Sequence, residues 1–461
     1  MKRLQSLGLV LLLGAVGIRA DDKPVINVLG TTKYLDLDPS VQHFPLDPYD
    51  KNSVHGIEKS SLPERLRFGI LEQLVDGDPT CLDEYCKLAL DEWPDYRECR
   101  YKDRILVNPR PAAEASGCTT ARHQQQEMIG DEEFCLQVDG HSIFTNKWDE
   151  VMLEEWKRIN NEMAILTVYP HDIHGFVKEN GDNNAPDWIP HLCTTIKGGN
   201  GLTRIVGASI KRNANFPQMT ALWGGGLSFS KCHAERNVPV DSHTPWLWDG
   251  EEFLRSADYW THGYDLYSPS RIGNVLYHNY SKKPASFWES PVDPAVKALD
   301  TEMTHNRVRL RVGLGFKGPV DAYELDKYKF GTARSFQQYL KFANMSFDGW
   351  MNETNSCGQL HWVPYSNAAE VEEIKWKKEV EDVVRQQAIG AHVKNGAGNG
   401  DEKPLVRHGV SSPGRRKRSN APAWGLLAVV LAALFVALSN DSKSRAIRQS
   451  CIAKAPHLSH D

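Results

Sequence analysis

The chain has 461 residues, of which 41% are hydrophobic and 25% charged, and its formal net charge is −5. This length and composition are typical of a globular protein with one large domain or two moderate ones. Because there is no excess of basic residues, the composition argues against nucleic acid as a partner.

Residues 1–20 are arranged like a secretory signal peptide. Lys2 and Arg3 precede the apolar run LGLVLLLGAVGI, and Ala20 stands at a suitable cleavage position. The run is short for a membrane span, so an uncleaved anchor is the weaker alternative. Residues 21–60 follow no sustained period and are predicted to form an irregular arm.

The folded domain is predicted to cover residues 61–365. Its first strand, Leu66–Leu71, ends at Glu72 and Gln73. Polar groups at the carboxyl end of a strand indicate a ligand site in an open α/β sheet. A second strand is predicted at Arg104–Val107.

A polar helix through Gln126 is predicted next. Arg122 on this helix has the planar guanidinium that pairs with a phosphate. The alternative is an exposed helical arginine without a ligand.

The central stretch combines a buried strand, an acidic turn and an amphipathic helix. Phe134–Val138 is predicted as the strand, and it stops at Asp139-Gly140-His141. Asn146 is suited to cap a helix that begins near Trp148. An acid and an imidazole at a strand end suit a metal site, whereas a turn residue and a surface histidine are the plain alternative.

Further strands are predicted at Ala164–Tyr169, Thr203–Ile210 and Ala221–Ser230. Strands alternating with helices at this spacing predict an α/β fold with a mainly parallel central sheet. Gly224 and Gly225 belong to a triplet of glycines within Ala221–Ser230. Such a triplet weakens a strand, but it is tolerable where a ligand or another backbone segment comes close.

A helix is predicted to open after Trp246–Gly250. Asp249, Glu251 and Glu252 at its start either serve as dipole partners or line a sugar pocket. A further short strand then places His278 at its end, where a lone histidine is usually structural.

Gly313–Gly318 matches the glycine pattern of dinucleotide-binding loops and follows the strand-like run Arg307–Val312. Pro319, however, stands where the phosphate-binding helix should continue, and the run alternates with arginines. A buried first strand would not carry them, so the dinucleotide interpretation is rejected.

The C-terminal part is predicted as a membrane anchor. Residues 366–419 form a helix and a flexible stalk, residues 420–440 a transmembrane helix, and residues 441–461 a cytosolic tail. The signal peptide would place the bulk of the chain in the lumen. Arg415–Arg418 resembles a proprotein-convertase site that would release a shed form, and an uncut basic stalk is the alternative.

Eight of the nine cysteines precede the predicted membrane helix, which favours disulfides in an oxidising compartment. Their connectivity cannot be read from the sequence. Asn279, Asn344 and Asn352 stand in glycosylation sequons, which agrees with secretion.

Nine segments between Leu66 and Trp350 together resemble the metal-dependent N-acetylglucosaminyltransferases of glycosyltransferase family sixty. That family includes enzymes acting on hydroxyproline of a ubiquitin-ligase adaptor and on threonine of mucin-like proteins. Besides the Ala121-Arg122 helix, the segments are FGILEQ, LQVDGH, ILTVYP, LWGGGLSFS, GEEF, WTHGYDLYSP, LYHNY and KFGTARSFQQYLKFA.

The resemblance implies a GT-A fold and retaining transfer of N-acetylglucosamine (GlcNAc) from UDP-GlcNAc to a polypeptide hydroxyl. By resemblance, Asp139, His141 and His278 hold Mn²⁺ or another divalent cation. Imidazole and carboxylate groups suit manganese, which offsets charge on the departing diphosphate.

The resemblance also implies donor and acceptor contacts, with Glu251 favoured over Glu252 as the carboxylate near the reacting centre. Same-face attack is favoured over a covalent intermediate, although both routes remain open. The residues implied around the nucleotide, sugar and acceptor are Glu72, Gln73, Arg122, Gly224, Gly225, Asp249, Glu251 and Glu252.

Two features depart from the family pattern. Its adaptor-modifying members are cytosolic, whereas this chain carries entry and anchor signals, which favours Ser, Thr or hydroxyproline acceptors in the Golgi or endoplasmic reticulum. Most Golgi transferases are anchored at the N-terminus, unlike this chain.

The alternative to a transferase is a catalytically inactive, lectin-like membrane protein on the same fold. If His278 is a buried ligand, Asn279 is expected to carry no glycan.

Overall fold

The structure is a computed structural model. It describes residues 9–13, 26–29, 56–140, 142–173, 176–178, 180–280, 292–347 and 353–374. All of these lie in the first of two compact units, residues 1–398. His141, most of the predicted stalk and the predicted transmembrane helix lie outside the described residues. Within the described ranges, no helix has the length and apolar character needed to cross a membrane.

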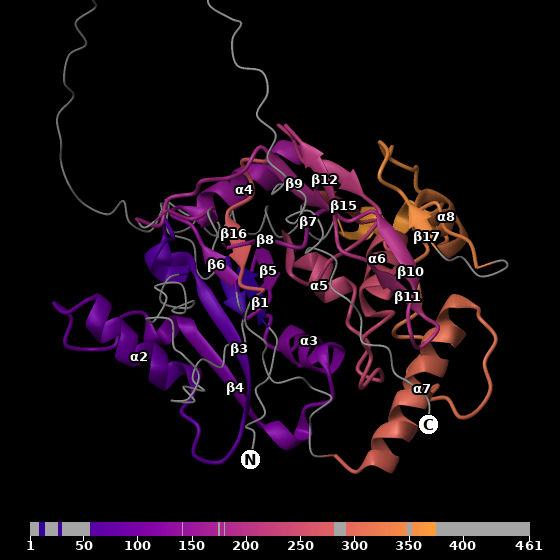
Figure 1. Cartoon of the computed structure of the whole chain (residues 1–461), viewed down its shortest axis with the longest axis horizontal. Coiled ribbons are helices and arrows are strands. Elements are labelled where there is room, and N and C mark those ends of the chain that lie inside the picture. Colours follow the sequence, from indigo (N-terminus) through magenta and orange to yellow (C-terminus); the bar gives the residue numbers. More distant parts are fainter. Residues whose placement is uncertain are drawn as a thin grey trace, which may run out of the picture. The chain divides into compact units, whose positions relative to one another are not determined.

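A nine-stranded mixed sheet lies at the centre of this unit (Figure 1). Its order is β1-β3-β2-β5-β14-β7-β15-β13, with β4 beside β3. The strands are β1 (Leu9–Leu13), β2 (Ile26–Leu29), β3 (Arg67–Leu74), β4 (Ile105–Pro111), β5 (Phe134–Val138), β7 (Ala164–Thr167), β13 (Gln218–Thr220), β14 (Leu227–Lys231) and β15 (Asp265–Ser268). β1 lies within the predicted signal peptide. It pairs with the same residues of β5 as β2 does.

The predicted α/β class is confirmed, and most strands of the central sheet run in one direction, but the sheet is mixed because β1, β13 and β14 run opposite to the others. β14 runs antiparallel between β5 and β7, and β13 runs antiparallel to β15. The parallel pairs are β2 with β3, β2 with β5, β3 with β4 and β7 with β15. An apolar run predicts burial on both faces of a sheet but carries no information about strand direction.

Three smaller sheets flank the central one. They contain β6 (Ser142–Phe144), β16 (Leu276–His278) and β8 (His171–Asp172); β11 (Thr203–Ile205), β10 (Thr194–Lys197) and β17 (Glu353–Asn355); and β12 (Ser209–Arg212) with β9 (Trp188–His191). The predicted single strand Thr203–Ile210 is therefore two strands that belong to different sheets.

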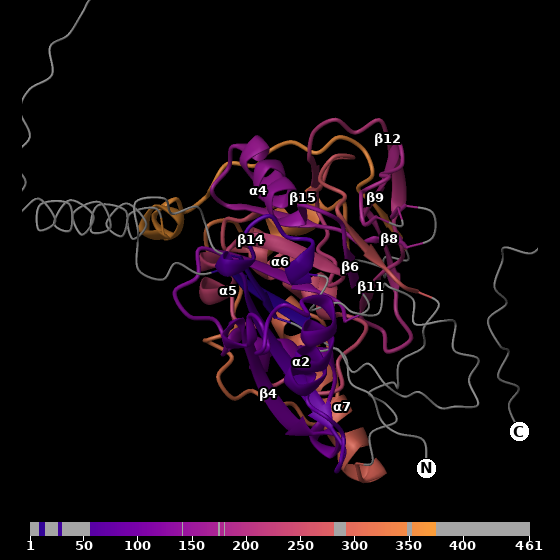
Figure 2. The same cartoon turned by 90° about the vertical axis from the view of Figure 1, so that its left-hand side faces the viewer.

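Seven α-helices have both ends within the described residues, together with short 3-10 turns at Pro63–Arg65, Lys102–Arg104 and Ala112–Glu114. The helices are α2 (Cys81–Glu92), α3 (Cys118–Gln126), α4 (Trp148–Ile159), α5 (His233–Asn237), α6 (Glu251–Thr261), α7 (Pro294–Val312) and α8 (Phe336–Phe342). In both views α2, β4 and α7 lie at one end of the unit, and α4, β9 and β12 lie at the other (Figures 1 and 2).

Two local predictions need correction. The strand-like run Arg307–Val312 is the last part of α7, and Gly313 ends this helix with a left-handed φ of 78°. Asn146 does not cap α4, because the cap position is Lys147 and the Asn146 amide donates to Asp182 instead. In each case the local sequence was compatible with the predicted structure and with the observed one, and tertiary contacts decided between them.

Two apolar clusters hold the sheet and helices together. Trp148 of α4 packs with Leu136 and Phe229 on one side of the sheet, and Trp260 of α6 packs with α7 and α8. Each tryptophan is at most 1% exposed. Burial of a side chain of this size contributes on the order of 4 kcal/mol. This packing makes the central sheet a rigid support for the residues at its edges.

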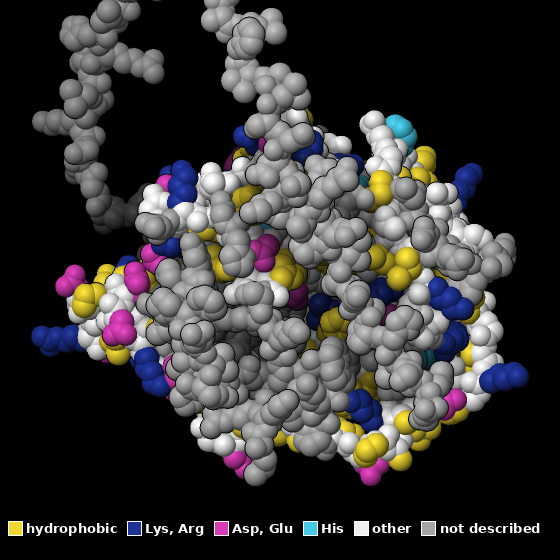
Figure 3. Space-filling view, viewed as in Figure 1, with side chains coloured by type: hydrophobic (Ala, Val, Ile, Leu, Met, Phe, Trp, Pro, Cys, Tyr) yellow, Lys and Arg dark blue, Asp and Glu magenta, His cyan; other side chains and the backbone are white. Residues whose placement is uncertain are grey.

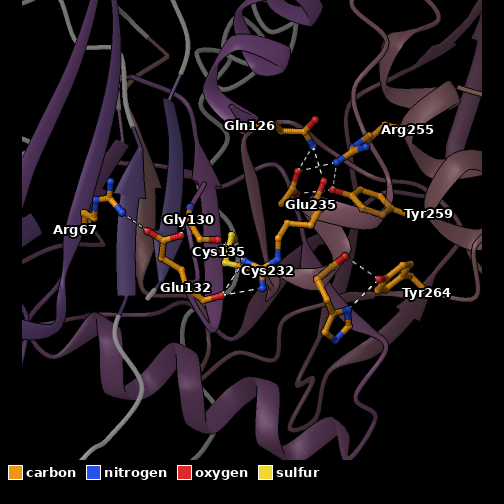
Figure 4. The surroundings of a disulfide bond; sticks show 12 residues. Arg67, Gln126, Gly130, Glu132, Cys135, Cys232, Glu235, Arg255, Tyr259 and Tyr264 are labelled. Atoms are coloured by element: carbon orange, nitrogen blue, oxygen red, sulfur yellow. Dashed lines mark hydrogen bonds and ion pairs between the residues drawn. A yellow bond between two sulfur atoms is a disulfide. The ribbon is translucent and has the colours of Figure 1, made fainter. Parts of the chain in front are cut away.

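Disulfides were expected from the cysteine content, and the structure contains three within its described part. They join Cys86 to Cys99, Cys135 to Cys232 and Cys193 to Cys357. The second links β5 to the residue before α5 (Figure 4). The disulfide expectation therefore holds for six of the eight cysteines. Cys118 is a free thiol.

Candidate active site

Polar residues from several elements meet where β5 and β7 end. Gln137 of β5 and Thr167 of β7 both pair with Ser228 of β14. Asp139 and Tyr169, each two residues further on, are therefore level with each other at one edge of the sheet. This is the edge that the sequence predicted for ligand binding.

Two of the three predicted metal ligands converge at this edge. In the small sheet beside it, His278 of β16 pairs with Ser142 of β6, three residues after Asp139. This pairing brings the His278 Nε2 atom to 3.9 Å from the Asp139 Oδ2 atom. The third predicted ligand, His141, lies outside the described residues.

The surroundings of His278 favour a neutral imidazole. Burial lowers the pKa of His278, and the charges of Asp139 and Asp172 act in the opposite direction. A metal ligates only the neutral ring. Asp172 pairs with His278 in the ladder of β8 and β16. Asp172 was not among the site residues predicted from the sequence.

The distance between Asp139 and His278 is compatible with one divalent cation between them. Donor atoms that each lie about 2.1 Å from a small cation are at most about 4.2 Å apart. The 3.9 Å between Asp139 and His278 is within this limit. In the part of the chain that the structure describes, no group of three or more such side chains is found. A complete ligand set would therefore need His141 or another donor.

Arg122 of α3 meets the first turn of α6. Its guanidinium forms an ion pair with Glu251 and lies 5.4 Å from the ring centroid of Trp223. The thiol of Cys118, one helical turn earlier, lies 3.2 Å from the Glu251 carboxylate. Burial raises the pKa of this thiol, so it stays protonated and can donate to the acid. Arg122 is thus oriented by the protein rather than exposed on a helix.

Glu252 is held by two donors at the same edge. The backbone N–H of Gly225 donates to its Oε1 at 2.9 Å, and the Tyr169 hydroxyl donates to its other oxygen. Burial raises the pKa of Glu252, the Asp139 charge adds to this, and the two hydrogen bonds act against it. Burial, followed by the Glu252 charge, raises the pKa of Tyr169, which keeps the phenol a donor.

The glycine triplet lies before β14, not inside a strand as predicted, and close packing explains it. A Cβ atom on Gly225 would collide with the Arg122 guanidinium. A Cβ atom on Gly224 would lie 2.6 Å from Leu192 and 2.9 Å from Tyr169, which is too close. Side chains, and not the ligand or backbone that was expected, therefore approach these two glycines closely.

Comparison with known proteins identifies the family. Residues 87–348, more than half of the chain, match the sequence model of the family described as Glycosyltransferase (GlcNAc). The chain belongs to this glycosyltransferase family. Its matched region contains Arg122, Asp139, Glu251, Glu252 and His278, which are the residues that the fold gathers at one edge.

No curated protein matches the chain of this glycosyltransferase. Among solved structures it is similar to the crystal structure of GalNAc-T7 with UDP, GalNAc and Mn²⁺, at 14% identity and a TM-score of 0.40. That alignment covers 62% of this chain and 52% of the GalNAc-T7 chain.

Glu72 and Gln73 of the glycosyltransferase lie at the same edge but have structural contacts. Arg67 of β3 and Cys135 of β5 both align with Asn27 of β2, so Glu72 is level with Gly140, just beyond the end of β5. The Glu72 carboxylate accepts a hydrogen bond from the backbone N–H of Cys81, the first residue of α2. Gln73 is 8% exposed.

Asp249 is engaged by the turn between β10 and β11. Its carboxylate accepts a hydrogen bond from Gly199 N at 3.1 Å and lies 3.6 Å from the Arg204 guanidinium. The Asp249 carbonyl accepts from the Asn200 amide at 3.0 Å. In this glycosyltransferase, Asp249 therefore fixes the turn that leads to the start of α6.

Proposed function

We propose that this glycosyltransferase carries out retaining, metal-dependent transfer of GlcNAc from UDP-GlcNAc to a hydroxyl of a polypeptide. The acceptor residue would be Ser, Thr or hydroxyproline. One observation carries the proposal: the Asp139–His278 pair, the Arg122–Glu251 pair and Glu252 meet at one edge of an α/β sheet. This arrangement, together with the family, supports a GT-A type of nucleotide-sugar site.

Asp139 and His278, with His141, would hold the divalent cation, Mn²⁺ in our proposal. When bound, this ion supplies positive charge that offsets the charge of the diphosphate. The chain itself contributes Arg122, whose direction is fixed by Glu251 and by the face of Trp223. Because the guanidinium of Arg122 is held in place before the reaction, its positive charge can stabilise the negative charge that develops on the departing group without reorganisation.

For the carboxylate nearest the reacting carbon, the contacts support Glu252 rather than the predicted Glu251. Glu251 forms the ion pair with Arg122, whereas Glu252 accepts from Gly225 and Tyr169 and interacts with the charges of both Arg122 and Asp139. In same-face transfer, the bond from the sugar carbon to the diphosphate breaks as the acceptor oxygen bonds to that face. The acceptor proton passes to the departing phosphate oxygen, and Glu252 would stabilise the positive charge on the sugar.

The compartment is part of the proposal. The signal peptide, the C-terminal anchor and the possibility of shedding after Arg418 rest on the sequence alone. Three disulfides within the described residues support an oxidising compartment. We therefore place the catalytic domain in the lumen of the Golgi or endoplasmic reticulum, with polypeptides of the secretory pathway as acceptors.

The test is release of UDP from UDP-GlcNAc by the full chain with Mn²⁺. Asp139→Ala is expected to lower the rate at least about a hundredfold, because the ion loses a ligand. Asp187→Ala is the control, since Asp187 is an exposed acid paired with Arg212. Sugar binding without turnover in the parent, unchanged by Asp139→Ala, would instead support the lectin-like alternative.

A further inference from the structure

Helices α3 and α6 are linked at two levels, one helical turn apart, directly at the first and through a third residue at the second. At the first level Arg122 of α3 pairs with Glu251 of α6. Gln126 and Arg255 follow these residues by four positions, so they lie on the same helix faces. At this second level both side chains bind the carboxylate of Glu235, which belongs to α5 (Figure 4).

Glu235 is buried and receives three donors. Its Oε2 atom accepts from Gln126 Nε2 at 2.5 Å and from Arg255 Nη2 at 2.7 Å, and its Oε1 atom accepts from the Tyr259 hydroxyl at 2.5 Å. Glu235 is 4% exposed and Arg255 is 5% exposed. A buried carboxylate with this many donors has a fixed position, because any displacement leaves a buried charge with fewer partners.

The helix that carries Glu235 is tied to the strand that carries Asp139. Cys232, three residues before Glu235, forms a disulfide with Cys135 of β5 (Figure 4). Asp139 follows Cys135 by four residues on the same strand and turn. Glu235 therefore connects both helices of the site to the strand that ends in the metal site.

From this arrangement we propose that Glu235 is a positioning residue, which fixes the crossing of α3 and α6 and thereby holds Arg122 against Glu251. The inference rests on the proposed transferase function only for its kinetic consequence. The structural part of the proposal, that Glu235 links α3 to α6, does not depend on the reaction.

Glu235→Gln tests the proposal with little change in size. The amide keeps one acceptor oxygen but presents an NH₂ group to side chains that are themselves donors. With the amide oxygen in place of Oε2, the NH₂ group faces the Tyr259 hydroxyl, which loses its acceptor, and buried Arg255 loses the negative charge that it pairs with. The second level of contact then loosens. Glu155→Gln is the matched control, because Glu155 is also buried and bound to an arginine, Arg158, but lies on α4.

Cys118 reports on the contact without any activity. Its thiol lies between the two helices, 3.2 Å from Glu251 and 3.5 Å from the carbonyl oxygen of Leu247. In the full chain, alkylation of Cys118 by iodoacetamide, followed by mass spectrometry, should be about tenfold faster in Glu235→Gln than in the parent, because local opening exposes the thiol. Equal rates in the parent, Glu235→Gln and Glu155→Gln would overturn the positioning role.

Kinetics separate positioning from a general loss of stability. Glu235→Gln should lower kcat for UDP release about tenfold with little change in KM, because Arg122 acts in the transition state. In an Arg122→Ala background the same substitution should cause no further loss. Losses that multiply in both backgrounds would contradict the proposal.

Two other outcomes remain distinguishable. If Glu235→Gln does not fold, Tyr259→Phe removes one donor and is expected to give intermediate Cys118 alkylation and intermediate kcat. No UDP release from the parent would refute the proposed function, while the alkylation rates would still decide the role of Glu235.

Discussion

At the scale of single residues, the candidate site depends on how closely side chains and backbone approach each other. Gly225 lies beside the Arg122 guanidinium and donates its N–H to Glu252. Its backbone needs no left-handed conformation, so a change to alanine would act through the added methyl group alone. The glycine is therefore a direct probe of the position of Arg122.

Gly225→Ala is expected to lower the rate of UDP release about a hundredfold, because displacement of a positioned group by about 1 Å has effects of this size. The melting temperature should change little. Gly199→Ala is the control, since a Cβ atom there would meet nothing within 4 Å. Equal activity of the two variants would show that Arg122 does not need its observed position.

Tyr169→Phe tests the role of Glu252 through pH. The hydrogen bond from Tyr169 lowers the pKa of Glu252 against the effect of burial. Without the hydroxyl, Glu252 takes up a proton at higher pH. If the reaction needs ionised Glu252, the acid limb of the pH–rate profile should move to higher pH. An unchanged limb would argue against Glu252 in this role, and circular dichroism would verify folding.

The sequence located part of this residue network. Asp139 and Arg122 follow from strand ends, helix patterns and family resemblance, and the structure places Asp139 near His278 and Arg122 against Glu251. Tyr169 and Glu235 were not recognised as site residues, because their partners are 83 residues away for Tyr169 and 109 for the contact between Glu235 and Gln126. Contacts at such separations arise from the tertiary fold and leave no local pattern.

At the scale of elements, α7 shows how long-range ion pairs override a local pattern. Arg307–Val312 alternates like a strand, yet Asp293 caps a helix that continues through it. Arg307 is fully buried, and its Nε atom lies 2.8 Å from Asp241. Arg311 adds a second pair with Asp258 at 2.6 Å. The arginines thus face the protein, which an isolated run of six residues could not indicate.

Arg307→Met is expected to lower the free energy of unfolding by about 3–5 kcal/mol, because it leaves the Asp241 carboxylate buried with a weaker partner. The loss should be measured by urea denaturation. Replacing both residues, as in Arg307→Met with Asp241→Leu, should recover much of it, since the unpaired charge is gone. A single substitution without effect would mean that this pair does not fix α7.

At the scale of the whole molecule, the disulfides join parts of the chain that are far apart in sequence. The Cys193–Cys357 bond spans 164 residues and connects the end of the described domain to the segment before β10. The sequence predicted this class of bond from the cysteine count, but pairing depends on the fold. Such cross-links are typical of an oxidising compartment, where glycosylation of sequons also takes place.

The glycosylation sequons test compartment and site geometry together. Asn279 is partly buried directly after His278, whose carbonyl oxygen accepts from Ile173 N, and Tyr280 donates to Pro170 O at 2.8 Å. The backbone on both sides of Asn279 is therefore fixed at the sheet edge, whereas Asn344 is exposed.

In material from a eukaryotic secretory host, mass spectrometry should find a glycan on Asn344 and none on Asn279. Full occupancy at Asn279 would mean that a bulky glycan fits beside His278, which contradicts a closed metal site there. Absence of glycan at both positions would instead contradict the lumenal location, because Asn344 is exposed.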